Sequence, residues 1–117
     1  MTSKQFRALT PEQQLITVAE LAGWKEIAYR GPDGRYGLLT GRRSLNVPLA
    51  VPEYLHDLNA MRDAVASVVK QRGVGWTVTF NHCLYEVLGH HDHVEHEAIH
   101  ATARQRAEAF VLAMEKG

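Results

Sequence analysis

The chain lacks an excess of charge of either sign. Lysine and arginine together number 13, as do aspartate and glutamate, and the isoelectric point is about 7.1. A protein that binds duplex nucleic acid without sequence preference needs surplus basic groups to displace counterions from the phosphates. The charge balance therefore argues against nucleic acid as a general partner.

The chain also has little cysteine and no long apolar run. Cys83 is its single cysteine, so no intrachain disulfide can form, which suits a reducing cytoplasm. No apolar stretch is long enough to cross a bilayer, and residues 1–16 carry no apolar signal-peptide core. We therefore expect a soluble cytoplasmic protein without a membrane partner, and the length of 117 residues predicts one domain, 1–117.

The clearest helix signal lies in the middle of the chain. Asp57 is a good N-cap, because its carboxylate can accept from the free N–H groups of a first turn. Apolar residues then recur on one face of a 3.6-residue period, at Leu58, Met61, Val65, Val68 and Val69. Gly73 and Gly75 follow, so the pattern predicts a helix that ends near Arg72.

Two further helices are predicted by their opening residues. Thr10, Pro11 and Gln13 give a capping box with proline at the first helical position. Thr102 and Gln105 repeat the capping box before a stripe that comprises Ala103, Ala107, Phe110, Val111 and Met114. We expect residues 1–9, in contrast, to be a frayed start.

The remaining segments are read as strands. Residues 24–30 and 35–40 flank the turn sequence Gly-Pro-Asp-Gly, which predicts a hairpin. Apolar residues alternate with threonine over 76–80, a strand follows over 83–88, and Asn81-His82 is the predicted turn between them. The resulting order is α-β-β-α-β-β-α. It predicts an α+β fold with a mostly antiparallel four-stranded sheet and helices packed on it.

Three runs carry a resemblance to a known family. They are Val51–Met61 (V-P-E-Y-L-H-D-L-N-A-M), Ala101–Phe110 (A-T-A-R-Q-R-A-E-A-F) and Ala22-Gly23-Trp24. Together they resemble the phage ABA sandwich domain family, which has no assigned activity. The resemblance implies a three-layer α/β/α sandwich, a phage or prophage origin and a site of action in the host cell. From these runs we predict four interaction residues, namely Trp24, Tyr54, Asp57 and Asn59.

The longest connection, 41–52, is the predicted binding loop. Pro48 and Pro52 keep it extended. Arg42 and Arg43 could meet a small anion or a nucleotide at its mouth. The alternative interpretation is that both are solvated loop arginines.

Residues 96–100 match H-E-x-x-H, the signature of zinc metalloproteases. On a helix, His96 and His100 could share a zinc ion, with Glu97 as the general base. The capping box at Thr102 argues against this hypothesis, because a cap residue is not helical and the chain before it would be extended. Extended residues four apart are separated by about 13 Å, too far to share one ion.

A weaker metal site is the second interpretation of the same segment. On an extended chain, His91 and His93 project to one side about 7 Å apart, and could hold zinc or nickel adventitiously. The alternative is a solvated polar loop.

The function predicted from the sequence is therefore binding without catalysis. In one version the protein is an interaction module that associates with itself or with another protein. In the other it sequesters a small anion or a nucleotide at Arg42 and Arg43. The enzyme alternative is a metal-dependent hydrolase that uses His96, Glu97 and His100.

Overall fold

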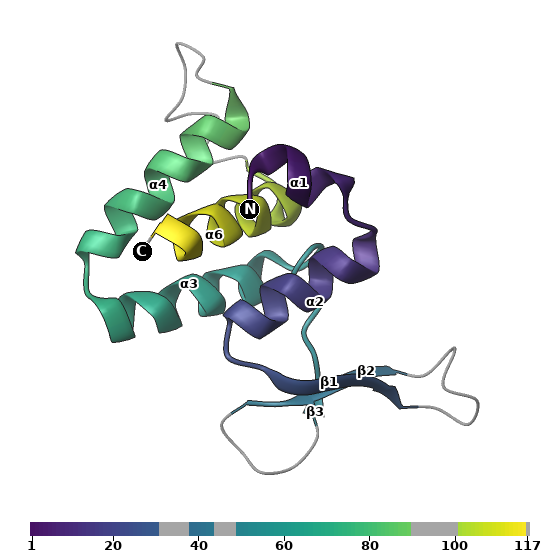
Figure 1. The fold of residues 1–117 in the computed structure, drawn as a ribbon. Helices are drawn as coiled ribbons and strands as arrows, with labels where there is room; N and C mark the ends of the chain where they lie inside the picture. The colour runs from purple at the N-terminus through teal and green to yellow at the C-terminus, as the bar shows by residue number, and fades with distance from the viewer. Residues whose placement is uncertain (31–37, 44–48, 90–100, 117) are drawn as a thin grey trace.

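A computed structural model describes residues 1–30, 38–43, 49–89 and 101–116 of the chain. Those residues form five helices and three strands (Figure 1). The helices are α1 (Ser3–Ala8), α2 (Pro11–Leu21), α3 (Leu58–Arg72), α4 (Gly75–Leu88) and α6 (Ala103–Lys116). The strands are β1 (Lys25–Arg30), β2 (Leu38–Arg42) and β3 (Leu49–Ala50).

Helix α6 is the centre of the helical part. It contacts α1, α2, α3 and α4, and its contact with α4 is the most extensive between any two elements of the described chain. Figure 1 shows the other helices around it and the sheet at one end of the group. The helix is buried on nearly every side, at Ala103, Ala107, Glu108, Ala109, Phe110, Val111, Leu112 and Ala113. The hydrophobic core is therefore mainly helix packed on helix.

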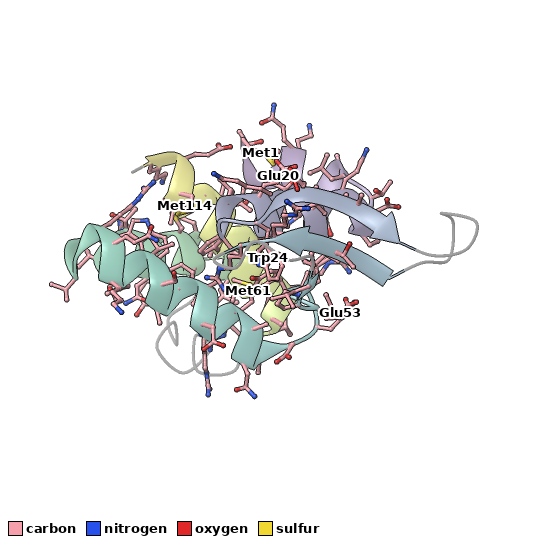
Figure 2. All side chains as sticks on the ribbon, turned by 90° about the horizontal axis from the view of Figure 1, so that it is seen from below. Met1, Glu20, Trp24, Glu53, Met61 and Met114 are labelled. Carbon is pink, nitrogen blue, oxygen red and sulfur yellow. The ribbon has the colours of Figure 1, made fainter. Side chains whose placement is uncertain are left out.

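The sheet is small and antiparallel, with strand order β1-β2-β3. The predicted antiparallel pairing of the two strands is confirmed, because β1 pairs with β2 from Lys25↔Arg42 to Arg30↔Leu38, whereas the predicted turn at 31–34 lies outside the described residues. Gly41 allows the close approach of the sheet to Trp24, since a Cβ at this position would lie 3.2 Å from Trp24 Cε3 and 3.1 Å from Lys25 O. Figure 2 shows Trp24 where the strands meet the helices.

The three helices predicted from caps and stripes are confirmed. Thr10 and Gln13 form the capping box of α2, and Thr102 and Gln105 form that of α6. The Asp57 carboxylate caps α3 by accepting from the N–H groups of Asn59 (2.9 Å) and Ala60 (3.3 Å). Gly73, at φ +92°, ends α3.

The prediction of a second hairpin over 76–88 is wrong, because these residues form α4. Its buried side chains recur at helical spacing, namely Trp76, Phe80, Cys83, Leu84 and Val87. Val78, which the predicted alternation put beside Trp76 and Phe80, is 72% exposed. The predicted turn at Asn81-His82 lies inside the helix. Packing against α6 outweighs the strand preference of the Thr-Val-Thr run.

The predicted architecture is wrong in consequence. The described residues contain a three-stranded sheet rather than a four-stranded one, and it lies at one end of the helices rather than between two layers of them (Figure 1). The third strand, β3, comes from the predicted binding loop. The broad α+β class holds.

The prediction of a frayed start over residues 1–9 is also wrong. Residues 3–8 form α1 instead of a frayed end, because Thr2 and Gln5 make a capping box and Phe6 is buried against the core. The N-terminal amine forms an ion pair with Glu115, so the start of the chain lies beside the end of α6. No helix in the described ranges is both long enough and apolar enough to cross a bilayer.

Candidate functional site

The segment 51–61 divides into a buried half and an exposed half. Val51, Tyr54, Leu55, Ala60 and Met61 are buried in the core. The residues between them, Glu53, His56, Asp57, Leu58 and Asn59, are exposed. Core packing explains the first set, whereas Asp57 alone among the second has an evident structural role, as the cap of α3.

Two of the predicted interaction residues meet in the core. Trp24 Nε1 donates a hydrogen bond of 2.9 Å to the hydroxyl of Tyr54, and the two side chains are 6% and 1% exposed. Burial raises the pKa of Tyr54, while the hydrogen bond from Trp24 and the charge of Arg43 act in the opposite direction. This hydrogen bond joins the segment Ala22-Gly23-Trp24 to the segment 51–61. Both aromatic side chains therefore belong to the core beneath the exposed residues of 51–61, and neither forms part of the exposed surface.

The exposed half of the segment lines an open depression of about 580 Å³, which we call the motif hollow. Its lining residues are Glu53, His56, Asp57, Leu58, Asn59 and Arg62. It therefore contains two of the predicted interaction residues, Asp57 and Asn59. Besides Leu58, which is 40% exposed, the lining includes two carboxylates and one guanidinium. Figure 2 shows Glu53 at the periphery of the molecule.

A second hollow, the apolar groove, lies among α3, α4 and α6. It measures about 240 Å³ and is lined by Met61, Arg62, Val65, Ala66, Val69, Thr77, Phe80 and Arg106. Arg62 lines both hollows, so the groove adjoins the motif hollow along α3. The two hollows are therefore neighbours that share Arg62.

The side chain of Arg106 contacts the backbone just before α6. Its Nε donates a hydrogen bond of 3.2 Å to the carbonyl oxygen of Ala101. Burial lowers the pKa of Arg106, and the nearby charge of Arg62 lowers it further.

A third hollow lies between α1 and α6, and the polar side chains that line it make hydrogen bonds that join the helices. Arg7 donates two hydrogen bonds to the buried carboxylate of Glu108, at 2.7 and 3.2 Å. Arg104 donates to the side-chain oxygen of Gln14 at 2.6 Å, and the Gln14 amide donates to the carbonyl of Phe6 at 2.9 Å. These polar groups bind one another and fix α1 and α2 to α6.

The arginines of the predicted binding loop lie at the sheet. Arg42 ends β2 and forms an ion pair with Glu26, with 2.9 Å between Nε and the carboxylate oxygen. Arg43 is exposed and lies close enough to Tyr54 to affect its pKa. Residues 44–48 of the loop lie outside the described chain.

The histidine segment 90–100 also lies outside the described residues, and with it the predicted ligands His91, His93, His96 and His100 and the base Glu97. Within the described ranges, no three His, Cys, Asp or Glu side chains are grouped to hold a metal ion. Metal analysis of untagged protein and of His96→Ala tests the hydrolase hypothesis, which expects stoichiometric zinc that the variant loses.

Comparisons of the chain with family models, with curated proteins and with solved structures give no match. The resemblance to the phage family therefore remains a prediction that depends on three short runs of sequence.

Sequence reasoning missed the apolar groove and its two arginines. Arg62 and Arg106 come from helices far apart in the chain, and the wall between them includes Phe80 of α4. The available signal was the spacing of Trp76, Phe80 and Cys83, which fits a helix. Had that helix been predicted, Arg62 beside the apolar stripe of α3 would have suggested a cationic edge to a helix–helix groove.

Proposed function

We propose that this protein is a small phage- or prophage-type binding domain that works by protein–protein contact at the motif hollow, without catalysis. Its first partner is a second copy of the same chain. The observation that carries the proposal is the exposure of Glu53, His56, Leu58 and Asn59 inside the segment 51–61, whose other half contributes to the core.

The shape of the motif hollow suits a protein better than a small molecule. Small-molecule sites are concave clefts that bury most of the ligand surface. The motif hollow is instead open, and an exposed leucine lies among its polar residues. An apolar centre with a polar rim is the usual composition of a protein–protein contact.

The charges of the hollow favour a second copy as the partner. A two-fold dimer brings the same patch of both chains together, so the patch must complement itself. Glu53 and Arg62 lie in one hollow and have opposite charges. In a two-fold pairing, Glu53 of each copy can therefore face Arg62 of the other. The zero formal net charge leaves no overall repulsion between copies near neutral pH.

Charge reversal tests this pairing. Glu53→Arg and Arg62→Glu would each place like charges opposite one another, and each is expected to weaken self-association by about tenfold or more. The double variant restores opposite charges and is expected to recover the wild-type dimer. Sedimentation velocity over a range of protein concentrations measures the dissociation constant of each.

Matched controls are available for both substitutions. Lys70→Glu makes the same charge change on α3 as Arg62→Glu, and Glu20→Arg matches Glu53→Arg, yet neither Lys70 nor Glu20 lines the motif hollow. Both controls should associate as the wild type does. A wild-type chain that stays monomeric, or single variants that dimerise normally, would contradict the proposal.

A further inference from the structure

Among the described residues that line the motif hollow, His56 alone belongs to a residue type that changes charge near neutral pH. A tight turn holds it in place, because the backbone N–H groups of His56 and Asp57 both donate to the carbonyl oxygen of Glu53, at 2.9 and 2.8 Å. His56 is exposed, so its imidazole can exchange a proton with water. The charge of the hollow therefore depends on pH through this residue.

The fixed charges of the motif hollow do not balance. Its described lining carries two carboxylates, Glu53 and Asp57, and one guanidinium, Arg62, which leaves one negative charge in excess. When Glu53 of each copy faces Arg62 of the other, as proposed above, the excess is the carboxylate of Asp57. The N–H groups at the start of α3 donate to this carboxylate and offset part of its charge. A two-fold contact thus brings two excess charges of the same sign together, and their repulsion weakens it.

The charged groups from the neighbouring elements leave this excess unchanged. Burial raises the pKa of Tyr54, which lies beneath the exposed residues of 51–61, so its hydroxyl stays uncharged over the range in which histidine titrates. The charges of Arg43, beside β2, and Asp63, on α3, shift the pKa of Tyr54 in opposite directions. These two charges therefore offset one another near the hollow.

We infer that protonation of His56 strengthens the contact between copies, so that self-association through the motif hollow tightens as pH falls from about 8 to about 5.5. This inference rests on the function proposed above and names its regulation. The proton places a positive charge next to Asp57 in the chain and cancels the excess negative charge in each copy. Aspartate and glutamate ordinarily titrate at about pH 4, so the change of charge over this range belongs to the imidazole.

The dissociation constant at the two pH values is the quantity to measure. Sedimentation velocity at constant ionic strength gives it for the intact chain over a range of protein concentrations. One exposed pair of opposite charges contributes a factor of about three, and the two-fold contact holds two such pairs, so the dissociation constant should fall about tenfold at the lower pH. Added salt should reduce this change, because exposed charges are screened.

Three variants assign the change to His56. His56→Gln keeps a polar side chain that does not titrate, so its dissociation constant should not fall at the lower pH. His56→Lys carries the positive charge at both pH values, and should associate about tenfold more tightly than the wild type at the upper one. His82→Gln is the matched control for a chain with seven histidines, since His82 is exposed on α4 and lines neither the motif hollow nor the apolar groove. It should keep the full response to pH.

The outcomes separate this inference from the function on which it rests. Self-association that is lost in Glu53→Arg but equally strong at both pH values in the wild type would support the proposed contact and overturn its regulation by His56. A response to pH that persists in His56→Gln would assign that response to another histidine and overturn the inference as well. A wild-type chain that is monomeric at both pH values would contradict the proposed function itself, and the inference with it.

Discussion

Removal of a single oxygen atom, in Tyr54→Phe, tests how the segment 51–61 is anchored to the sheet. The ring stays, so the packing of this 1% exposed side chain is kept, and only the acceptor of the Trp24 Nε1–H bond is lost. A buried donor left without its partner costs about 1–3 kcal/mol. For a chain of this length each kcal/mol lowers the melting temperature by about 3–6 °C.

A double-mutant cycle with Trp24→Phe isolates the hydrogen bond from other effects. Trp24→Phe removes the donor and also leaves a void, so it destabilises the fold on its own account. In that background Tyr54→Phe should cost almost nothing, because no donor remains to be left unsatisfied. Urea unfolding followed by circular dichroism at 222 nm reports helix content and does not depend on the tryptophan that is replaced.

Two outcomes of the cycle would refute this reasoning. One is a cost for Tyr54→Phe below about 0.5 kcal/mol in the wild-type background, within the range of an ordinary surface substitution. The other is an equal cost in both backgrounds, which would mean that Trp24 is not the partner of the hydroxyl.

The remaining predictions concern helix α4. Phe80→Ala should cost about 3–5 kcal/mol in urea unfolding, whereas Val78→Asp should stay within about 0.5 kcal/mol. Similar losses of stability in both variants would instead support a strand over residues 76–80. Cys83 is fully buried and burial raises the pKa of its thiol, so iodoacetamide should label it only after unfolding. The stabilising effect of that raised pKa is present below the ordinary thiol pKa and is lost as pH rises through the raised value. Alkaline stability should therefore decline less in Cys83→Ala, and rapid labelling of native protein would contradict the burial.

The parts of the fold that the sequence predicted are those specified by local signals. Helices α2, α3 and α6 begin at side chains that bind the free N–H groups of their own first turns, at Thr10, Asp57 and Thr102. Strands β1 and β2 are neighbours in the chain and pair with each other in antiparallel fashion. The capping signals act within a few residues, so they can be recognised without knowing which distant segments pack against the helix.

Helix α1 was missed although its capping box at Thr2 and Gln5 is a local signal, whereas helix α4 and strand β3 depend on contacts between distant residues. Helix α4 has no side-chain N-cap, and its first residues alternate between apolar side chains and threonine. Its conformation is fixed by packing, in which Trp76 stacks on Phe80 with 5.6 Å between ring centroids and meets the edge of Phe110 at 6.0 Å. Strand β3 is two residues long and is defined by its pairing with β2.

The candidate site follows the same division. Asp57 and Asn59 of the motif hollow were predicted from a short run of sequence, whereas Arg62 and Arg106 line one groove only after α3, α4 and α6 have packed. Trp24 and Tyr54 were predicted as interaction residues from the same resemblance, yet both are buried and form a hydrogen bond with each other. Sequence alone does not separate residues that support a surface from residues that form it.

The most direct test of the proposed function is the dissociation constant of the Glu53→Arg/Arg62→Glu double variant in sedimentation velocity, compared with both single variants. Self-association that is lost in each single variant and recovered in the double would show that Glu53 and Arg62 face each other across a two-fold contact. A double variant as weak as the single ones, or a wild-type chain that is monomeric at every concentration, would contradict the motif hollow as the surface through which this protein acts.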